Sequence, residues 1–320
     1  MLRSRFVAAI SSVCLIVLGA GMVLAQDYPS KPIRIVTGSV GGGNDAMSRQ
    51  IAQGISGPLG QPVIVENRGT GFLSAEVVYK SPPDGYTLLV GAATLWMSAF
   101  FQKVPYDAVR DFSPVSLISR DVNVLVVHPS LPVKSVRELI ALAKSRPGEL
   151  NYGSGSRGSS SHLAAELLKH MAGVNIVWVS YKGSAPVITA LIGGEVQLTL
   201  LDPGLVAPHL KSGRLRALAV TSGTPSALAP DLPTVAASDL PGYEVVGMTV
   251  MLAPAKTPDA IVNRLNQEVV RVLNLPDVKE RLLTAGSEVV ASSPGQLAVT
   301  MKSEIAKWGK VIKDAGIKFD

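Results

Sequence analysis

Two segments rich in glycine and hydroxyl side chains carry most of the chemistry that this sequence offers. The first runs Thr37-Gly-Ser-Val-Gly-Gly-Gly-Asn-Asp45, and the second runs Gly153-Ser-Gly-Ser-Arg-Gly-Ser-Ser-Ser-His162. Each lies between an expected strand and an expected helix, where backbone N–H groups and the positive helix end can hold an anion. Glycine lets the backbone approach a ligand closely, and Ser or Asn side chains add hydrogen-bond donors. The sequence therefore predicts two anion-binding loops that could face each other across a cleft.

The same loops have other interpretations. Each could be an ordinary turn between a strand and a helix, capped by Asn44 or Ser161, although two such loops in one chain favour ligand binding. The spacing Gly153-x-Gly155-x-x-Gly158 also matches the dinucleotide-binding fingerprint. That fingerprint requires an acidic residue near position 178, and the next expected strand, Ile176-Val-Trp-Val-Ser180, contains none. We therefore expect no nucleotide cofactor.

Side chains for catalysis or metal binding are sparse. The four histidines form no H-E-x-x-H motif, and the second loop lacks the G-x-S-x-G elbow of serine hydrolases. We expect His162 and Asp45 to cap or pack at the starts of their helices, and Asp202 to belong to a turn. The sequence thus predicts no enzyme activity, no metal and no cofactor. The enzymatic alternative is an exported hydrolase that uses a serine of the second loop with His162, and ester turnover would support it.

The elements that must position these loops are short apolar strands alternating with amphipathic helices. Expected strands span 33–36, 63–65, 86–90, 122–127, 150–152, 176–179, 198–201, 215–220 and 245–252. Expected helices span 46–55, 74–79, 136–144 after a Ser135 cap, 161–171, 185–192, 259–273, 276–285 and 294–315. Strands separated by helices indicate βαβ units and a largely parallel sheet. Some 290 residues exceed one ordinary domain, so we expect two α/β lobes.

The first 25 residues have the composition of a secretory signal peptide. Arg3 and Arg5 precede an apolar run from Phe6, and a small residue, Ala25, ends it. We expect cleavage near Ala25 and export to the periplasm. The alternative is an uncleaved anchor, because residues 6–25 could almost cross a bilayer.

Composition narrows the function classes further. Cys14 is the sole cysteine and lies in the predicted signal peptide, so the exported chain would have no disulfide and no thiol chemistry. Two of the 30 Lys and Arg residues lie in that peptide, which leaves 28 against 24 Asp and Glu, a net charge near +4. These charges form no basic run, so we expect no nucleic-acid partner. A weakly positive field suits the capture of small anions.

Longer motifs run in order through the rest of the chain. They include Tyr28-Pro-Ser-Lys-Pro-Ile-Arg-Ile-Val36, Leu59-Gly-Gln-Pro-Val-Ile-Val-Glu-Asn-Arg68, Pro83-Asp-Gly-Tyr-Thr-Leu-Leu89, Tyr181-Lys-Gly-Ser-Ala-Pro186 and Gly213-Arg-Leu-Arg-Ala-Leu-Ala-Val-Thr221. In type and order these motifs resemble the Bug family, the periplasmic solute receptors of tripartite tricarboxylate transporters.

The resemblance implies a two-lobed periplasmic binding protein fold of type II, with mostly parallel sheets flanked by helices and joined by crossing hinge strands. The expected lobes are residues 26–124 plus 247–320 and residues 125–246. In this family the two loops clamp a ligand carboxylate, partly through bridging waters. Carried over by position, the implied ligand contacts are Ser39, Gly41, Gly42, Gly43, Asn44, Asp45, Ala92, Thr94, Ser154, Ser156, Ser159, Ser160, His162 and Asp202.

Departures from the family pattern bear on the ligand. The first loop usually contains prolines, and here 37–40 has none, while the usual Asp-Asn pair at 201–202 is Leu201-Asp202. Phe72, Leu73, Trp96 and Leu201 predict a more apolar distal end of the site, suited to an aromatic or branched carboxylate.

The expected function is capture of a small organic carboxylate between two lobes, by a monomer, for delivery to membrane transporter subunits. An alternative is a receptor that presents its closed form to a sensor kinase for signalling. Neighbouring permease genes would favour uptake, and a neighbouring kinase gene would favour signalling.

Overall fold

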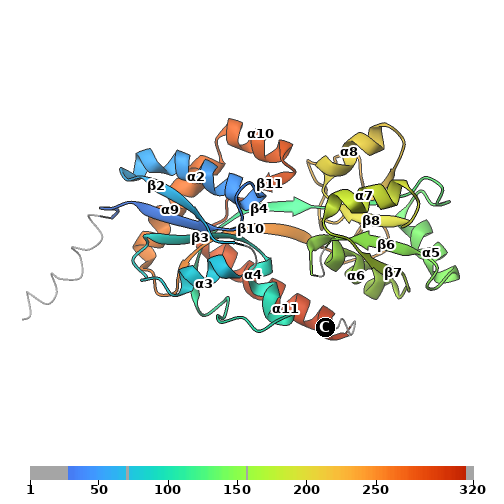
Figure 1. Cartoon of the computed structure of the whole chain (residues 1–320), viewed down its shortest axis with the longest axis horizontal. Coiled ribbons are helices and arrows are strands. Elements are labelled where there is room, and N and C mark those ends of the chain that lie inside the picture. The colour runs from blue at the N-terminus through green and yellow to red at the C-terminus, as the bar shows by residue number, and fades with distance from the viewer. Residues whose placement is uncertain (1–27, 70–71, 156–157, 315–320) are drawn as a thin grey trace, which may run out of the picture.

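Two β-sheets, each flanked by helices, form the two lobes of this chain (Figure 1). The computed structural model describes residues 28–69, 72–155 and 158–314. The predicted signal peptide therefore lies outside the described residues. Within them, none of the helices has the length and apolar composition that crossing a bilayer requires.

Lobe 1 is built on a six-stranded sheet with the order β11-β4-β10-β3-β1-β2. Its strands are β1 (Ile33–Thr37), β2 (Val63–Asn67), β3 (Thr87–Ala92), β4 (Phe112–Val122), β10 (Val246–Pro254) and β11 (Ser287–Val289). Its helices are α2 (Gly43–Leu59), α3 (Leu73–Tyr79), α4 (Thr94–Met97) with the 3-10 turn η2 (Ser98–Phe100), α9 (Asp259–Leu273), α10 (Pro276–Thr284) and α11 (Pro294–Asp314).

Lobe 2 is built on a five-stranded sheet with the order β7-β6-β8-β5-β9. Its strands are β5 (Val124–Val127), β6 (Asn151–Ser154), β7 (Val177–Ser180), β8 (Leu198–Leu201) and β9 (Arg216–Val220). Its helices are α5 (Val136–Ser145), α6 (Ser160–Ala172), α7 (Ser184–Ile192) and α8 (Pro203–Lys211). The predicted Ser135 cap of α5 is confirmed, because its side chain accepts a hydrogen bond from the Glu138 N–H.

Each sheet combines parallel and antiparallel pairs, so the sheets of the described residues are mixed and not mostly parallel as expected. The strands linked by helices are parallel, as the alternating pattern predicts: β1 with β2 and β3, and β6 with β7 and β8. The strands near the connections between lobes add antiparallel pairs, β10 with β3 and β4, β11 with β4, and β5 with β8 and β9.

The expected single strand at 122–127 is wrong. The chain breaks at Asn123, so that β4 ends in the sheet of lobe 1 and β5 begins in the sheet of lobe 2. The Asn123 N–H donates to Thr221 Oγ1 at 2.9 Å, and the Thr221 N–H donates to the Asn123 carbonyl at 2.9 Å. Thr221 in turn accepts from the Val245 N–H at 2.9 Å, so the segments that connect the lobes are tied to one another.

Several elements have no counterpart in the prediction. The first ten residues of β4 contain Pro, Ser, Arg and Asp, which obscure the alternation that marks a strand, and β11 has only three residues. Helix α8 begins with Pro203-Gly204 and contains Pro208, a composition that indicates a turn. Helix α2 begins at Gly43, three residues before the expected start, because the last glycine of the first loop is helical.

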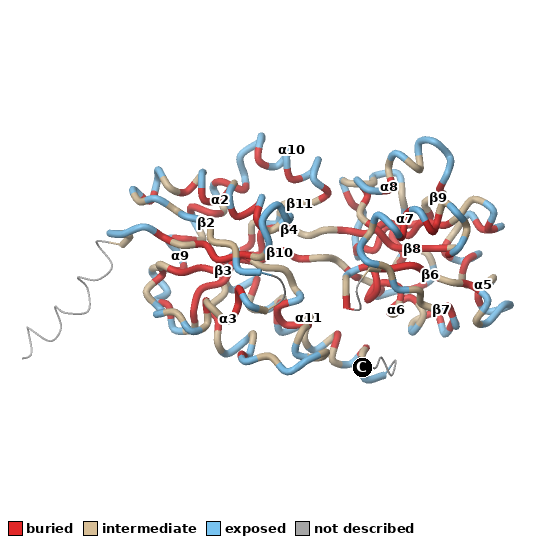
Figure 2. Tube along the Cα trace, in the orientation of Figure 1, coloured by how far each residue is buried: buried red, intermediate tan, exposed pale blue. Residues whose placement is uncertain are grey.

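A continuous apolar cluster extends through both lobes. It includes Leu89 and Trp96 in lobe 1, Leu125 and Tyr152 in lobe 2, and Tyr243 just before β10. Two further clusters lie within single lobes. One packs the sheet of lobe 1 against α2 and α9, and the other packs the sheet of lobe 2 against α7 and α8. Buried residues follow the strands and exposed residues follow the outer faces of the helices (Figure 2).

Candidate ligand-binding cleft

The first loop turns sharply between β1 and α2. The Gly42 N–H donates to the Ser39 carbonyl at 3.3 Å, and Gly41 at the third position of this turn has a φ of 78°. Such a φ favours glycine, which explains part of the glycine run. Gly42 then stands at the N-cap of α2 without a side-chain cap hydrogen bond, so Asn44 is not the cap that the alternative interpretation required. The first N–H groups of α2 therefore stay available to a ligand.

The carboxylate of Asp45 holds the first loop in place. One carboxylate oxygen accepts from the Gly41 N–H at 2.9 Å, and the other accepts from Asn67 Nδ2 at 2.9 Å and lies 3.0 Å from Arg49 Nη2. Asn67 also donates to the Gly38 carbonyl at 2.9 Å, so both ends of the turn are fixed to the end of β2. The Gly41 N–H, then Asn67 and Arg49, lower the pKa of Asp45 to about 2.

A pocket of 170 Å³ lies beside the first loop. It is formed by the loop, the end of β3 and the starts of α3 and α4, and its lining contains polar hydroxyl and amide groups beside aliphatic ones. Four predicted contacts lie together there: Ser39, Asn44, Ala92 and Thr94. The remaining lining residues are Gly38, Gly69, Ser74, Ala75, Leu89, Val90, Gly91 and Leu95. None of these lining residues is charged.

The sheet fixes the position of this pocket. Thr249 of β10 pairs with Ala92 of β3, and Thr249 Oγ1 donates to Asn44 Oδ1 at 3.3 Å. Ser74 is buried and donates to the Thr37 carbonyl at 2.8 Å. Sequence reasoning missed Ser74 and Thr249, because isolated hydroxyl residues inside a helix and a strand give no signal without the tertiary structure.

The second loop is packed more tightly than the first. Ser154 is fully buried, and its Oγ accepts from Trp178 Nε1 at 2.8 Å. The ring of His162 meets the Trp178 ring edge-on at 4.5 Å, and its Nδ1 accepts from the Gly158 N–H at 3.3 Å. His162 thus has the expected packing role in the first turn of α6, and its implied contact with a ligand stays a prediction.

Ser159, and not Ser161, is the N-cap of α6. Its Oγ accepts from the His162 N–H at 3.4 Å and lies 3.1 Å from the Ser161 hydroxyl. Ser160 begins the helix and is exposed. Ser156 lies outside the described residues. The second loop therefore combines one capped helix end with a buried aromatic and hydroxyl cluster.

The second loop meets lobe 1 through Gly158. A Cβ atom at Gly158 would lie 2.8 Å from Phe101, which directly follows η2, and the φ of Gly158 is 77°. The segment that begins at Thr94 therefore leads from the pocket of the first loop to the second loop.

Asp202 caps α8, with its Oδ1 accepting from the Gly204 N–H at 2.7 Å. Its carboxyl group also packs against Gly286 of lobe 1, where a Cβ atom would lie 2.4 Å from Oδ2. Burial raises the pKa of Asp202. The structure thus places Asp202 at the junction of the lobes, and not in the pocket of the first loop.

Two of the four residues expected to make the distal end of the site apolar, Trp96 and Leu201, lie in the core. Trp96 is 2% exposed and Leu201 is 3% exposed. Phe72 is half-buried and Leu73 is exposed at the start of α3. The apolar surface beside the first loop comes instead from Leu89, Val90 and Leu95.

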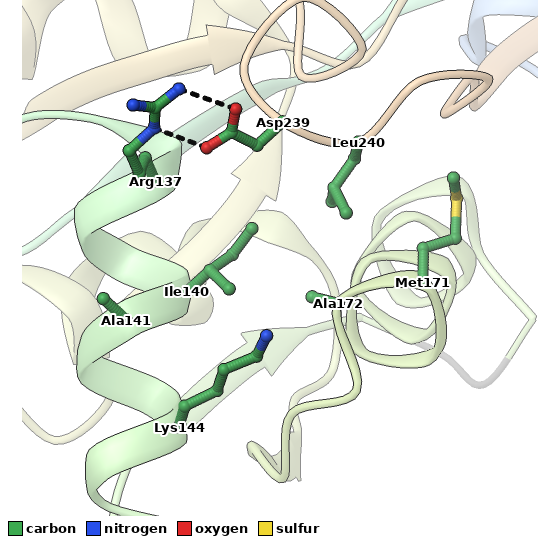
Figure 3. Close-up of a pocket in the computed structure, with 8 residues that line it drawn as sticks. All are labelled: Arg137, Ile140, Ala141, Lys144, Met171, Ala172, Asp239 and Leu240. Carbon is green, nitrogen blue, oxygen red and sulfur yellow. Dashed lines mark hydrogen bonds and ion pairs between the residues drawn. The ribbon is translucent and has the colours of Figure 1, made fainter.

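A second groove, of 340 Å³, lies between α5 and α6 in lobe 2 (Figure 3). Arg137 and Asp239 form an ion pair with two hydrogen bonds, at 2.5 and 2.8 Å, and Ile140 and Met171 are among the apolar residues that line the groove. None of the predicted ligand contacts among the described residues lines this groove, so the candidate site remains the pocket beside the first loop.

Comparisons with known proteins identify what this arrangement is similar to. A family model described as "Tripartite tricarboxylate transporter family receptor" matches residues 47–317. Protein BugT of Bordetella pertussis is 34% identical over 305 residues, covering 93% of this chain and 94% of BugT. The structure of R. palustris Rpa4515 with adipate has a TM-score of 0.73 at 38% identity, covering 91% of this chain and 99% of that chain. MatC from Rhodopseudomonas palustris with bound malate has a TM-score of 0.71 at 31% identity, covering 89% of this chain and 100% of MatC.

Proposed function

Because this chain belongs to the receptor family of tripartite tricarboxylate transporters, we propose that it captures a small organic carboxylate in the periplasm, in the cleft between its two lobes. Family membership makes it a solute-binding receptor and not an enzyme. Relatives solved with adipate and malate support a carboxylate as the ligand.

The observation that carries this proposal is the uncapped start of α2. Gly42 provides no side-chain cap, and the N–H groups of Gly43, Asn44 and Asp45 occupy the first turn, where a 17-residue helix leaves donors unsatisfied. A carboxylate is stabilised there by hydrogen bonds and by the helix dipole. The neighbouring carboxylate of Asp45 is already engaged by Gly41, Asn67 and Arg49, which reduces its repulsion of an anion.

The pocket lining indicates the remainder of the ligand. Because the described residues that line this pocket carry no charged side chain, a second anionic group would have no countercharge among them. Leu89, Val90 and Leu95 offer aliphatic contacts, while Ser39 and Thr94 offer hydroxyl groups. We therefore propose a carboxylate with a short, largely apolar body at this end of the cleft.

The site residues and lobe boundaries belong to the same proposal. Loop contacts come from Ser39 and 41–45, from Ala92 and Thr94, and from the second loop, and Asp202 at the lobe junction is the remaining proposed contact. We assign lobe 1 to residues 26–124 plus 247–320 and lobe 2 to residues 125–246. Support comes from the strands, which lie at 33–122 and 246–289 in one sheet and at 124–220 in the other, within one residue of these boundaries.

In this scheme lobe closure traps the ligand, and the closed monomer docks on transporter subunits in the membrane. Export follows from the predicted signal peptide, cleaved near Ala25. Pull-down with solubilised membranes tests the partner: recovery of a transporter subunit supports uptake, whereas recovery of a sensor kinase alone contradicts it.

A matched pair of variants at Gly43 tests the ligand site. A Cβ atom at Gly43 would meet nothing within 4 Å, and Gly43 is exposed, so the position has room for both Gly43→Ala and Gly43→Asp. We expect a thermal-shift panel of mono-, di- and tricarboxylates to identify acids that raise the Tm of the wild-type protein and of Gly43→Ala. The aspartate variant places a negative charge where the ligand binds, and we expect its affinity to fall by about 100-fold.

Two results would contradict the proposal. One is a panel in which no carboxylate raises the Tm and native mass spectrometry finds no bound acid. The other is equal affinity of the alanine and aspartate variants. Citrate and other polar polyacids as the best ligands would contradict the apolar body alone.

A further inference from the structure

The short strand β11 connects the two lobes beside the hinge. Glu288 of β11 accepts from Ser226 Oγ at 2.5 Å and from the Ala227 N–H at 2.8 Å, through the same carboxylate oxygen. Ser226 belongs to lobe 2, and its side chain is buried. We propose that Glu288 is a positioning residue that ties lobe 2 to β11 and limits how far the ligand cleft opens.

The lobe 1 side of this connection is firmly anchored. β11 pairs with β4, and the Val290 N–H continues this pairing by donating to the Ile118 carbonyl at 2.9 Å. Ser287 Oγ donates to Asp121 of β4 at 2.6 Å. Because β4 is the strand that leads directly into lobe 2, any force on Glu288 acts next to the hinge at Asn123.

The lobe 2 side is anchored as well. The segment that carries Ser226 packs along β9, where the Val220 N–H donates to the Pro233 carbonyl at 2.9 Å and the Val235 N–H donates to the Val220 carbonyl at 2.9 Å. This segment begins directly after Thr221, which bonds to Asn123 at the hinge. A rotation of lobe 2 about the hinge therefore carries Ser226 with it and strains its bond to Glu288.

A second contact from the same strand region supports this role. Gly286 lies just before β11 and has a φ of 86°, and the Asp202 carboxyl group of lobe 2 packs against it. Contacts of lobe 2 with both Gly286 and Glu288 make this short segment a brace between the lobes. Removing the brace changes the relative free energies of open and closed forms, and ligand affinity changes with them.

The test measures the opening of the cleft in the ligand-free protein, so it does not depend on the identity of the ligand. Spin labels attached at Gln53→Cys on α2 and Thr189→Cys on α7, both exposed, report the distance between the lobes by double electron–electron resonance. We expect Glu288→Ala to increase the population of more open forms by about tenfold, because hydrogen bonds to a charged acceptor are lost.

Conservative and matched variants separate positioning from folding. Glu288→Gln keeps an oxygen acceptor for both donors. We expect its population of open forms to stay within about twofold of the wild-type value. Ser226→Ala removes one donor and should give an intermediate shift, which keeps the test valid if Glu288→Ala folds poorly. Glu280→Ala removes an exposed carboxylate of α10 and should leave the distances unchanged.

The proposal is overturned if Glu288→Ala and Ser226→Ala give the wild-type distance distribution. A lower Tm in both variants with an unchanged distance distribution overturns it as well. If the distances change but no carboxylate binds the wild-type protein, the brace stands and the proposed ligand class fails.

Discussion

The two glycine- and serine-rich loops have similar compositions but are held by different interactions. The first loop rests on charged and amide groups, with Asp45 bonded to Gly41, Asn67 and Arg49. The second rests on packing, with Ser154, His162 and Trp178 in one buried cluster. The helix after the first loop has no side-chain cap, whereas Ser159 caps the helix after the second. Glycine and serine content therefore does not show how a loop is supported or which helix end stays open for an anion.

The largest expected effect comes from removing the support of the first loop. Asp45→Ala leaves the Gly41 N–H and Asn67 Nδ2 without their acceptor, and Arg49 without its partner. We expect the free energy of unfolding to fall by about 3 kcal/mol and carboxylate binding to be lost. Urea denaturation measures the first quantity and calorimetry the second.

Asp84→Asn is the matched control for Asp45→Ala, because it disturbs an exposed ion pair with Lys31. We expect a change within about 0.5 kcal/mol there. Equal effects of the two variants would show that the buried network does not support the first loop.

The second loop should respond to crowding at its contact with lobe 1. Gly158→Ala meets Phe101 and forces alanine into a φ of 77°, so we expect a loss of about 2 kcal/mol in the free energy of unfolding. Gly173→Ala has a φ of 64° but meets nothing within 4 Å, so it should lose only about 1 kcal/mol. If the two variants lose equal stability, the Phe101 contact has no energetic role.

A smaller effect is expected from the hydrogen bond inside the second loop. Trp178→Phe keeps a ring beside His162 but removes the Nε1 donor to Ser154. We expect a loss of about 1 kcal/mol, since a buried hydroxyl loses one neutral hydrogen bond. A Ser154→Ala, Trp178→Phe double variant should lose less than the sum of the single variants, and full additivity would argue against the bond.

The smallest expected effect is the loss of stability in acid that the first loop causes through Asp45. The pKa of Asp45 is about 2 in the folded protein, below the ordinary value of 3.8, so its ionised form stabilises the fold. This contribution is complete above the unfolded pKa and is lost as pH falls from about 4 towards 2. We expect the Tm of the wild-type protein to fall more steeply over this range than that of Asp45→Asn. Parallel curves would contradict the lowered pKa.

Much of the architecture could be read from local patterns. The alternation of apolar strands and amphipathic helices predicted β1, β2, β8 and α9 closely, because each has regular periodicity and clear ends. The break at Asn123 could not be predicted, since Val-Asn-Val-Leu reads as one uninterrupted apolar strand. Its two halves enter different sheets, and the Asn123 N–H at the break bonds to Thr221, which lies 98 residues away.

By itself the sequence determined which segments bear the chemistry, because glycine, serine and asparagine at the carboxyl ends of strands are a local property. It also determined the alternating α/β pattern and the resemblance to a receptor family. Tertiary structure alone decided which predicted contacts share a pocket and which hold the protein together. Ser39, Asn44, Ala92 and Thr94 meet because β1 and β3 are neighbours in the sheet, whereas Asp202 faces Gly286. That distinction depends on contacts between residues far apart in the chain, which local sequence patterns do not encode.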